Sequence, residues 1–212
     1  MLRVLFRRRL GAAAGWLLVT ACGEAAPRTA ADSQAAHVAE VIAAGGTVDS
    51  ILPIDEQLRR FREGMQPVDT LRHASPSQEA LVRRFLVALT RRDTAALNAL
   101  VIDRAEFAYL YYPGSALSLP PYEAPPQLLW GQILASSNEG VAKALTRVGG
   151  AGISLETIRC PAPPVAEGGN RLHQNCEIHI RIGDRPPETG RWFGTIVERE
   201  GRYKLLGLAN AL

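Results

Sequence analysis

The hydrophobic period of this chain changes at Gly152. Before Gly152, apolar residues recur at helical spacing, as Leu81, Phe85 and Leu89 do, whereas after it apolar and polar residues alternate, as in "ISLETIRC" at 153–160. Apolar residues three or four apart predict amphipathic helices, and strict alternation predicts half-buried strands. Helices followed by a run of strands favour an α+β fold in which N-terminal helices pack on an antiparallel sheet.

Capping signals place the helices of this fold. Ser75, Pro76 and Gln78 form a capping-box pattern, and Asp93 is the expected cap of a second helix, "DTAALNALV". The first of these helices has an apolar face made of Leu81, Val82, Phe85, Leu86 and Leu89. Its arginines lie off that face and are Arg83, Arg84, Arg91 and Arg92. Two further helices are expected at 127–136 and 138–148.

The part after Gly152 predicts four strands. Links such as "GDRPPET" and "EREGRY" carry the Gly, Pro and charged residues of hairpin turns. The expected strands are 153–160, 172–182, 190–200 and 202–210. The third carries apolar residues on both faces, with Trp192 and Ile196 on one and Phe193 and Val197 on the other. This favours either a homodimer or covering of the sheet by residues 47–73, because a sheet with one wet face needs only one apolar face.

The first residues have the organisation of an export signal. Four arginines (Arg3, Arg7, Arg8 and Arg9) precede an apolar run at 10–19. A membrane-spanning helix needs about 20 apolar residues, so this run is too short to be one and is typical of a signal peptide. The run ends in "VTAC" at 19–22, which resembles the lipobox of bacterial lipoproteins.

The lipobox resemblance implies an anchor. It implies that residues 1–21 are a lipoprotein signal peptide and that Cys22 is acylated, with the lipid bilayer as its partner. Gly23 follows the cysteine where an Asp would signal retention in the inner membrane, so the resemblance favours the periplasmic face of the outer membrane. Ordinary signal-peptide cleavage near Ala21 or Ala25 is the alternative.

The net charge argues against nucleic-acid binding. The full chain has a net charge of +3, but residues 1–21 hold four arginines and no acidic residue, so their removal leaves −1. A basic footprint for nucleic acid is therefore absent from the mature chain.

The chain divides into a tether, a helical segment and one domain. Residues 22–46 are rich in Ala and form the lipidated tether, with a short helix expected from a cap at Ser33 to Gly45. Residues 47–74 form an N-terminal helical segment, in which "PIDEQLRRFREG" carries Ile54, Leu58 and Phe61 in one stripe. Such a stripe must dock on another surface, for which the domain at 75–212 is the candidate.

The order of these elements is similar to the NTF2-like cone fold. A helix, the helix "DTAALNAL", an aromatic connection, a helix and a strand meander occur in that order over about residues 75–212. The resemblance implies a curved four-stranded antiparallel sheet. The stretches "EFAYLYYP", "PPY" and "GRWFGTIVEREGRYKLLGLAN" are also similar to an uncharacterised set of bacterial envelope lipoproteins, which implies no particular activity.

An aromatic cluster is the candidate ligand pocket. It comprises Phe107, Tyr109, Tyr111, Tyr112, Tyr122 and Trp130, with Glu106 beside it. Tyr and Trp side chains offer a ligand apolar faces and polar tips, but the same residues could instead pack to close the end of the sheet. Asp103, Arg104 and Glu106 precede the cluster, and a carboxylate held there in an apolar pocket would suit a general acid or base, which some NTF2-like enzymes use. Alternatively, Asp103 and Arg104 belong to a solvated loop after a helix, and Glu106 is a residue of the first turn of the next helix.

No metal site or cofactor is expected. "HQNCEIH" contains His173, Cys176 and His179, but alternation along a single strand would point Cys176 away from the two histidines. "GGAG" at 149–152 runs from helix to strand, which is the wrong order for a phosphate loop.

Cys160 and Cys176 are expected to form a disulfide. Cys160 ends one predicted strand and Cys176 lies near the start of the next, so an antiparallel pairing brings them opposite each other on the face that carries Ile158 and Ile178. An oxidising periplasm would preserve the bond. Two buried free thiols are the alternative.

These observations favour a lipid-anchored envelope protein whose domain binds a ligand or scaffolds an envelope protein partner. A small-molecule enzyme that uses a carboxylate in the cone pocket, and a structural homodimer subunit, are the alternatives.

Overall fold

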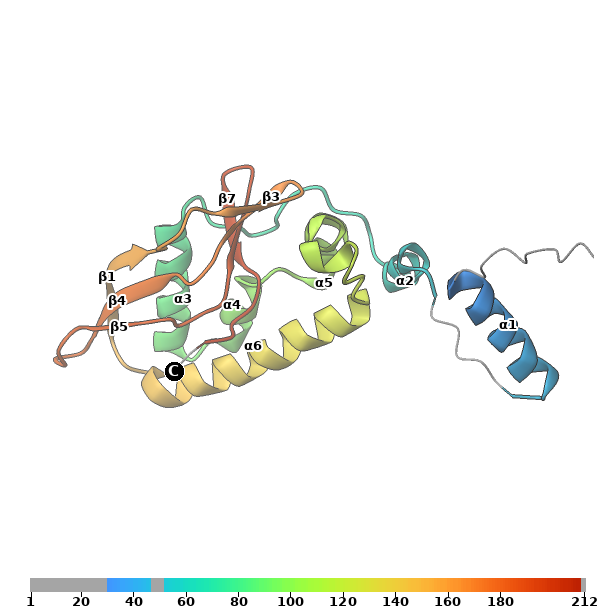
Figure 1. Ribbon diagram of the computed structural model, residues 1–212. Helices are drawn as coiled ribbons and strands as arrows, with labels where there is room; N and C mark the ends of the chain where they lie inside the picture. Colours follow the sequence, from blue (N-terminus) through green and yellow to red (C-terminus); the bar gives the residue numbers. More distant parts are fainter. Residues whose placement is uncertain (1–29, 47–51, 211–212) are drawn as a thin grey trace, which may run out of the picture. The chain divides into compact units, whose positions relative to one another are not determined.

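The computed structural model describes residues 30–46 and 52–210 (Figure 1). Helix α1 (Ala30–Ala43) belongs to a unit separate from the domain that starts at residue 51. It begins before Ser33, so Ser33 is not its N-cap, and it is followed by Gly45 with a φ of 77°. The expected signal peptide and Cys22 lie outside the described residues. Among those described, no helix is both long and apolar enough to cross a bilayer.

The domain contains helices first and strands afterwards, as the change of period predicts. Its α-helices are α2 (Ile54–Phe61), α3 (Gln78–Arg91), α4 (Thr94–Ala99), α5 (Arg104–Glu106) and α6 (Pro126–Val148). Between α5 and α6 lie a π-helical turn, η1 (Phe107–Tyr111), and two 3-10 turns, η2 (Tyr112–Gly114) and η3 (Ala116–Ser118). The strands are β1 (Ile153–Arg159), β2 (Val165–Glu167), β3 (Asn170–His173), β4 (Glu177–Ile182), β5 (Glu188–Gly190), β6 (Ile196–Arg199) and β7 (Arg202–Leu205).

Helix α3 starts two residues later than its capping pattern predicts. Ser77, not Ser75, is the N-cap, and its side chain accepts a hydrogen bond from the Ala80 N–H. Ser75 instead forms a bridge with Tyr203 of β7, and Gln78 turns its side chain toward β3. The apolar face of α3 is buried as expected, and Asp93 caps α4 through the Ala96 N–H.

Helix α6 is one continuous helix where two were expected. The polar run at Ser136, Ser137 and Asn138 lies where the two expected helices meet. Ser136 instead bonds to the carbonyl of Gln132 in the preceding turn, and Ser137 accepts a hydrogen bond from the Leu208 N–H. Ser136 and Ser137 therefore have partners inside the helix and on the C-terminal segment, and they need not end the helix.

The strands form two antiparallel sheets instead of the expected single four-stranded sheet. One sheet has three strands in the order β1-β4-β5, and the other has four in the order β2-β3-β6-β7. Two expected strands, 172–182 and 190–200, are each divided between the two sheets. The first division occurs around Asn175, which has a φ of 53°, a left-handed conformation that Asn tolerates better than most residues. The α+β class is confirmed, and the sheet prediction is wrong in this respect.

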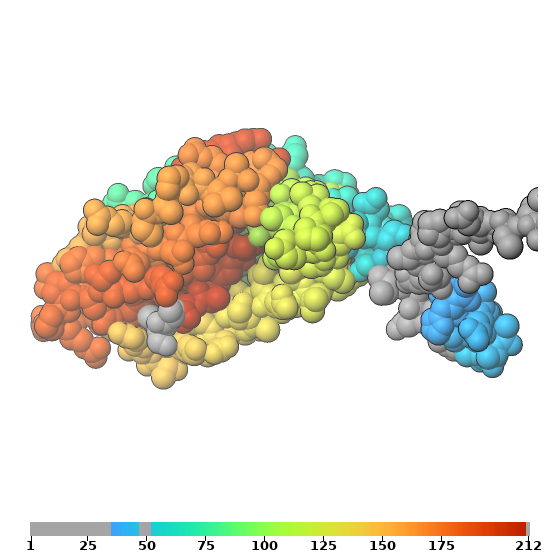
Figure 2. Space-filling view, in the orientation of Figure 1, coloured from blue at the N-terminus to red at the C-terminus, as the bar shows by residue number. Residues whose placement is uncertain are grey.

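Two hydrophobic cores lie on opposite sides of β6. Ile196 belongs to the first core and Val197 to the second, as alternation along a strand requires. The first core contains the buried faces of α3 and β4, and the second contains Phe61, Phe107 and their neighbours. On the face shown in Figure 2, the strands (orange to red) lie next to α6 (yellow), with the α5–η1 region (yellow-green) beyond them.

The apolar residues on both strand faces are covered within the chain. Trp192, Phe193 and Ile196 are buried in the first core, while Val197 packs in the second, which also contains Phe61 of α2. Arg104 lies over the Phe61 ring and Phe107 meets it edge-on, so the predicted docking of the α2 stripe is confirmed. The apolar residues on both faces of this segment are therefore not an argument for a homodimer.

Candidate functional site

Glu106 lies in the interior but is held by partners on both of its oxygens. It is the last residue of α5, and its side chain is fully buried. Oε1 accepts the Arg72 N–H at 2.5 Å, and Oε2 accepts the Asp103 N–H and the Lys204 ammonium, each at 2.7 Å. Asp103 caps the same short helix, so Asp103 and Glu106 complete a capping box.

Lys204 supplies the charge that makes burial of Glu106 tolerable. Its side chain is 3% exposed and comes from β7, on the side of the strand opposite Leu205. A lone buried carboxylate would be strongly disfavoured, whereas a paired and hydrogen-bonded one can be retained. Since both oxygens of Glu106 already accept from protein groups, this carboxylate has the environment of a structural ion pair.

The Asp103 carboxylate also has protein partners, so its interpretation as a solvated loop residue is wrong. Its carboxylate accepts the Ala105 and Glu106 N–H groups and pairs with Arg72 at 2.5 Å. Burial alone would raise the pKa of Asp103, but the hydrogen bonds from Glu106 and Arg72 and the charges of Arg72 and Lys204 outweigh it, so that the pKa is lowered. Asp103 is therefore an ionised cap.

The aromatic residues expected to line a pocket pack mainly on one another. Phe107 is fully buried, and its ring centroid lies 5.3–5.9 Å from those of Tyr111, Tyr112 and Trp130. Tyr109 lies under the Arg62 guanidinium, 4.5 Å from its ring centroid. The alternative interpretation, packing that closes one end of the sheet, describes these contacts.

The tyrosines of this cluster differ in burial. Tyr112 donates to the Ala124 carbonyl at 2.7 Å, and burial raises its pKa to about 12. Burial also raises the pKa of Tyr111. Tyr122, in contrast, is 66% exposed, so the structure does not bring it together with the other members of the cluster.

The disulfide between Cys160 and Cys176 is present. Cys160 directly follows β1 and Cys176 directly precedes β4, next to the paired residues Arg159 and Glu177. Both sulfurs belong to the first core, as the shared face predicts. The segment between the cysteines is not only a loop, because it contains β2 and β3 of the other sheet.

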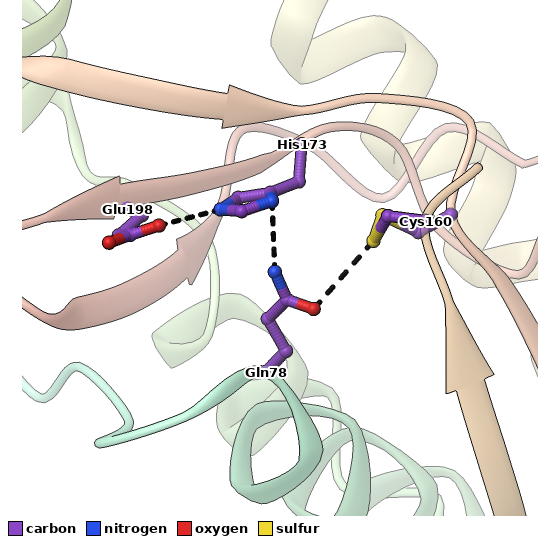
Figure 3. The surroundings of a disulfide bond; sticks show 5 residues. Gln78, Cys160, His173 and Glu198 are labelled. Atoms are coloured by element: carbon purple, nitrogen blue, oxygen red, sulfur yellow. Dashed lines mark hydrogen bonds and ion pairs between the residues drawn. A yellow bond between two sulfur atoms is a disulfide. The ribbon is translucent and has the colours of Figure 1, made fainter. Parts of the chain in front are cut away.

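Gln78 lies between this disulfide and His173, and Glu198 lies on the other side of the histidine ring (Figure 3). Glu198 Oε2 lies 2.7 Å from His173 Nε2, and Gln78 Nε2 lies 2.9 Å from Nδ1. Since an ionised carboxylate can only accept, Nε2 carries the proton and the Gln78 amide donates to Nδ1. Gln78 Oε1 then faces Cys160 Sγ at 3.7 Å. Both ring nitrogens are used within the protein, so the network joins α3, β3 and β6 and leaves neither nitrogen to take a substrate proton.

The two histidines considered for a metal site belong to different sheets. His173 lies in β3 and His179 in β4, so the expected single strand through both histidines is wrong, and alternation along one strand does not relate their side chains. In the part of the chain that the structure describes, no group of three or more His, Cys, Asp or Glu side chains is placed to hold a metal ion.

Two surface pockets offer different chemistry. One, of about 280 Å³, is lined mainly by polar and glycine residues of the loops before β4 and β6 and of the C-terminal segment, among them Asn175 and Arg191. The other is a groove of about 480 Å³ between α3 and α4. The α3–α4 groove is lined by Arg83, Arg84, Val87, Ala88, Arg91, Asp93, Ala96, Ala99 and Leu100.

The α3–α4 groove combines an apolar floor with an arginine rim. Ala88 and Leu100 are buried, and Val87 is 48% exposed among arginines that are themselves exposed. Small-molecule sites are commonly apolar depressions of about 300–1,000 Å³ with a few polar groups that orient the ligand. Of the sites described, this groove best meets that pattern.

The sequence placed the groove arginines off the apolar face of a helix, and it did not predict a groove there. The available signal was the spacing Arg83, Val87 and Arg91, which places an apolar residue between two cations on one face. Lys204 gave no comparable signal, because its partner lies 98 residues away and the pairing depends on the tertiary fold.

Comparisons of the chain with protein-family models, with curated proteins and with solved structures give no match.

Proposed function

We propose that this chain is a lipid-anchored binding module of the bacterial envelope, held at Cys22 on the periplasmic face of the outer membrane. The leader and "VTAC" at 19–22 support the anchor. The Cys160–Cys176 disulfide supports an oxidising compartment such as the periplasm.

We propose further that residues 75–212 form an NTF2-like domain. The order α3, α4, aromatic connection, α6 and strands supports this assignment. The division of the strands into two sheets is a departure from the single curved sheet that the resemblance implies.

The state of Glu106 is the observation that favours binding over catalysis. The carboxylate expected to act as an acid or base has both oxygens occupied by Lys204 and two backbone N–H groups, and it is fully buried. General acid–base chemistry needs a group within hydrogen-bond reach of the substrate. The exposed α3–α4 groove, in contrast, is accessible to a ligand.

Membrane fractionation with mass spectrometry of the mature N-terminus tests the anchor. We expect the wild-type chain in the outer-membrane fraction with an acylated Cys22, and the Cys22→Ala variant outside the membrane fraction. Gly23→Asp is the matched control, because it keeps the cysteine and should move the protein to the inner membrane. A mature N-terminus without acyl groups would reject the proposal.

A further inference from the structure

One arginine of the α3–α4 groove, Arg91, differs from its neighbours in having no side-chain partner among the described residues. Arg83 pairs with Glu79 at 2.6 Å, and Arg84 donates to the His73 carbonyl at 2.8 Å. Arg91 is exposed and has no hydrogen-bond or ion-pair partner for its side chain among residues 30–46 and 52–210. Its guanidinium is therefore available for a ligand, and its fork geometry suits carboxylate or phosphate oxygens.

An apolar surface lies directly beside this cation. Arg83, Val87 and Arg91 are spaced by four residues, so they follow one another along one face of α3. Across the groove, α4 and the residue after it present Ala96, Ala99 and Leu100. A ligand that contacts Arg91 with an anionic group would thus place its next atoms over Val87 and these residues.

The charge of the groove selects the sign of the ligand. Its lining contains three arginines and one acid, Asp93, whose carboxylate already accepts the Ala96 N–H at 2.9 Å. Glu79 offsets the charge of Arg83, so three arginines less two carboxylates leave a net charge of +1. The resulting positive field attracts an anion and repels a cation. A purely polar anion would leave the exposed Val87 surface in water, whereas an alkyl chain would cover it.

We propose that the α3–α4 groove binds an anionic amphiphile, with one carboxylate or phosphate head group near Arg91 and a single alkyl chain along Val87. This assignment rests on the proposed function as a binding module and names its ligand class. An acidic peptide fits less well, because its backbone amides would lie over apolar side chains without hydrogen-bond partners.

Calorimetric titration of the mature chain tests the proposal. The protein would carry Cys22→Ser and be exported behind a cleavable signal peptide, so that the disulfide forms and no acyl chain competes. Dodecanoate and dodecyl phosphate present the two head groups on the same chain, and their comparison separates a fatty-acid source from a phospholipid source. Dodecyltrimethylammonium and acetate, each lacking one required feature, are the ligand controls.

We expect saturable binding of dodecanoate, dodecyl phosphate or both, and no saturable binding of either control ligand. Arg91→Gln should weaken binding about tenfold, because it removes a charge-assisted hydrogen bond. Val87→Glu should weaken it at least as much by placing a negative charge on the floor. Val165→Glu is the matched control, since Val165 is 47% exposed on β2, and it should leave binding unchanged.

Four results would overturn the proposal: no saturable binding of either amphiphile by folded protein, equal binding of the cationic surfactant, tighter binding of an acidic peptide, or affinities that Arg91→Gln leaves unchanged. Because Arg91 is exposed, its variant remains informative even if Val87→Glu does not fold. None of these results affects acylation of Cys22, so failure of the groove and failure of the anchor are distinguishable.

Discussion

The two cores of the domain are stabilised by different means. The first core is largely aliphatic and contains the Cys160–Cys176 disulfide, with Ile178 and Ile180 fully buried beside it. The second is built around Phe107 and other aromatic rings, next to the buried Glu106–Lys204 ion pair. Beside both cores the ionisable side chains are already paired within the protein, as Glu106 is with Lys204 and His173 with Glu198, so they stabilise the fold instead of facing a ligand.

Of the changes that test these two cores, removal of the buried cation Lys204 should lower the free energy of unfolding the most. Lys204→Met leaves the Glu106 carboxylate buried without its countercharge, which should lower the free energy of unfolding by about 3–5 kcal/mol. Urea denaturation of the mature protein measures it. Lys143→Met removes an exposed i,i+4 pair with Glu139, which water screens, and should change the free energy of unfolding far less. Equal effects of the two substitutions would contradict a structural role for Lys204.

Loss of the disulfide, which belongs to the first core, should cause the next largest decrease in the free energy of unfolding. The cysteines are separated by 16 positions, and closure of a loop of about 15 residues contributes about 3 kcal/mol in the chain-entropy model. The Cys160→Ala/Cys176→Ala variant should lose that amount, and a reductant should destabilise only the wild type. Peptide mapping without reductant checks the bond directly. Two alkylatable cysteines in protein from an oxidising compartment would refute it.

The start of α3 offers a smaller test. Ser77→Ala removes the side chain that accepts the Ala80 N–H and should cost about 1 kcal/mol, as measured by thermal or urea unfolding. Ser77→Asp retains an acceptor at the cap and should keep most of the stability. If Ser77→Ala were neutral while Ser77→Asp was destabilising, the assignment of the cap to Ser77 would be wrong.

The smallest expected effect is the acid dependence contributed by Asp103. Its pKa is lowered in the folded protein, so its stabilisation is fully present above the unfolded-state pKa and is lost as the pH falls through the folded value. Asp103→Asn keeps a good N-cap but cannot titrate, so its unfolding free energy should fall less steeply with acidification. Parallel pH profiles for the two proteins would mean that Asp103 contributes nothing to this dependence.

The local features of the fold were predictable because they depend on neighbouring residues. The apolar face of α3, the cap at Asp93 and the strand alternation that buries Cys176, Ile178 and Ile180 all follow from short-range spacing. The disulfide was also predictable, because its two cysteines end paired strands.

The features that sequence reasoning missed depend on contacts between distant residues. The assignment of β3 and β4 to different sheets depends on a local turn at Asn175 and on pairing of β3 with β6. The partner of Glu106 comes from β7, and Gln78 meets His173 only after α3 packs beside β3. Spacing along the chain carries no information on such pairs.

We expect ligand recognition to take place in the α3–α4 groove and not in either core. Methyl-labelled mature protein titrated with dodecanoate and followed by NMR tests it most directly. We predict shifts concentrated at Val87, Ala88, Ala96, Ala99 and Leu100, which line the groove. Shifts concentrated instead at core methyl groups such as Ile178, Ile180 and Leu172, with the groove unaffected, would contradict recognition in the groove.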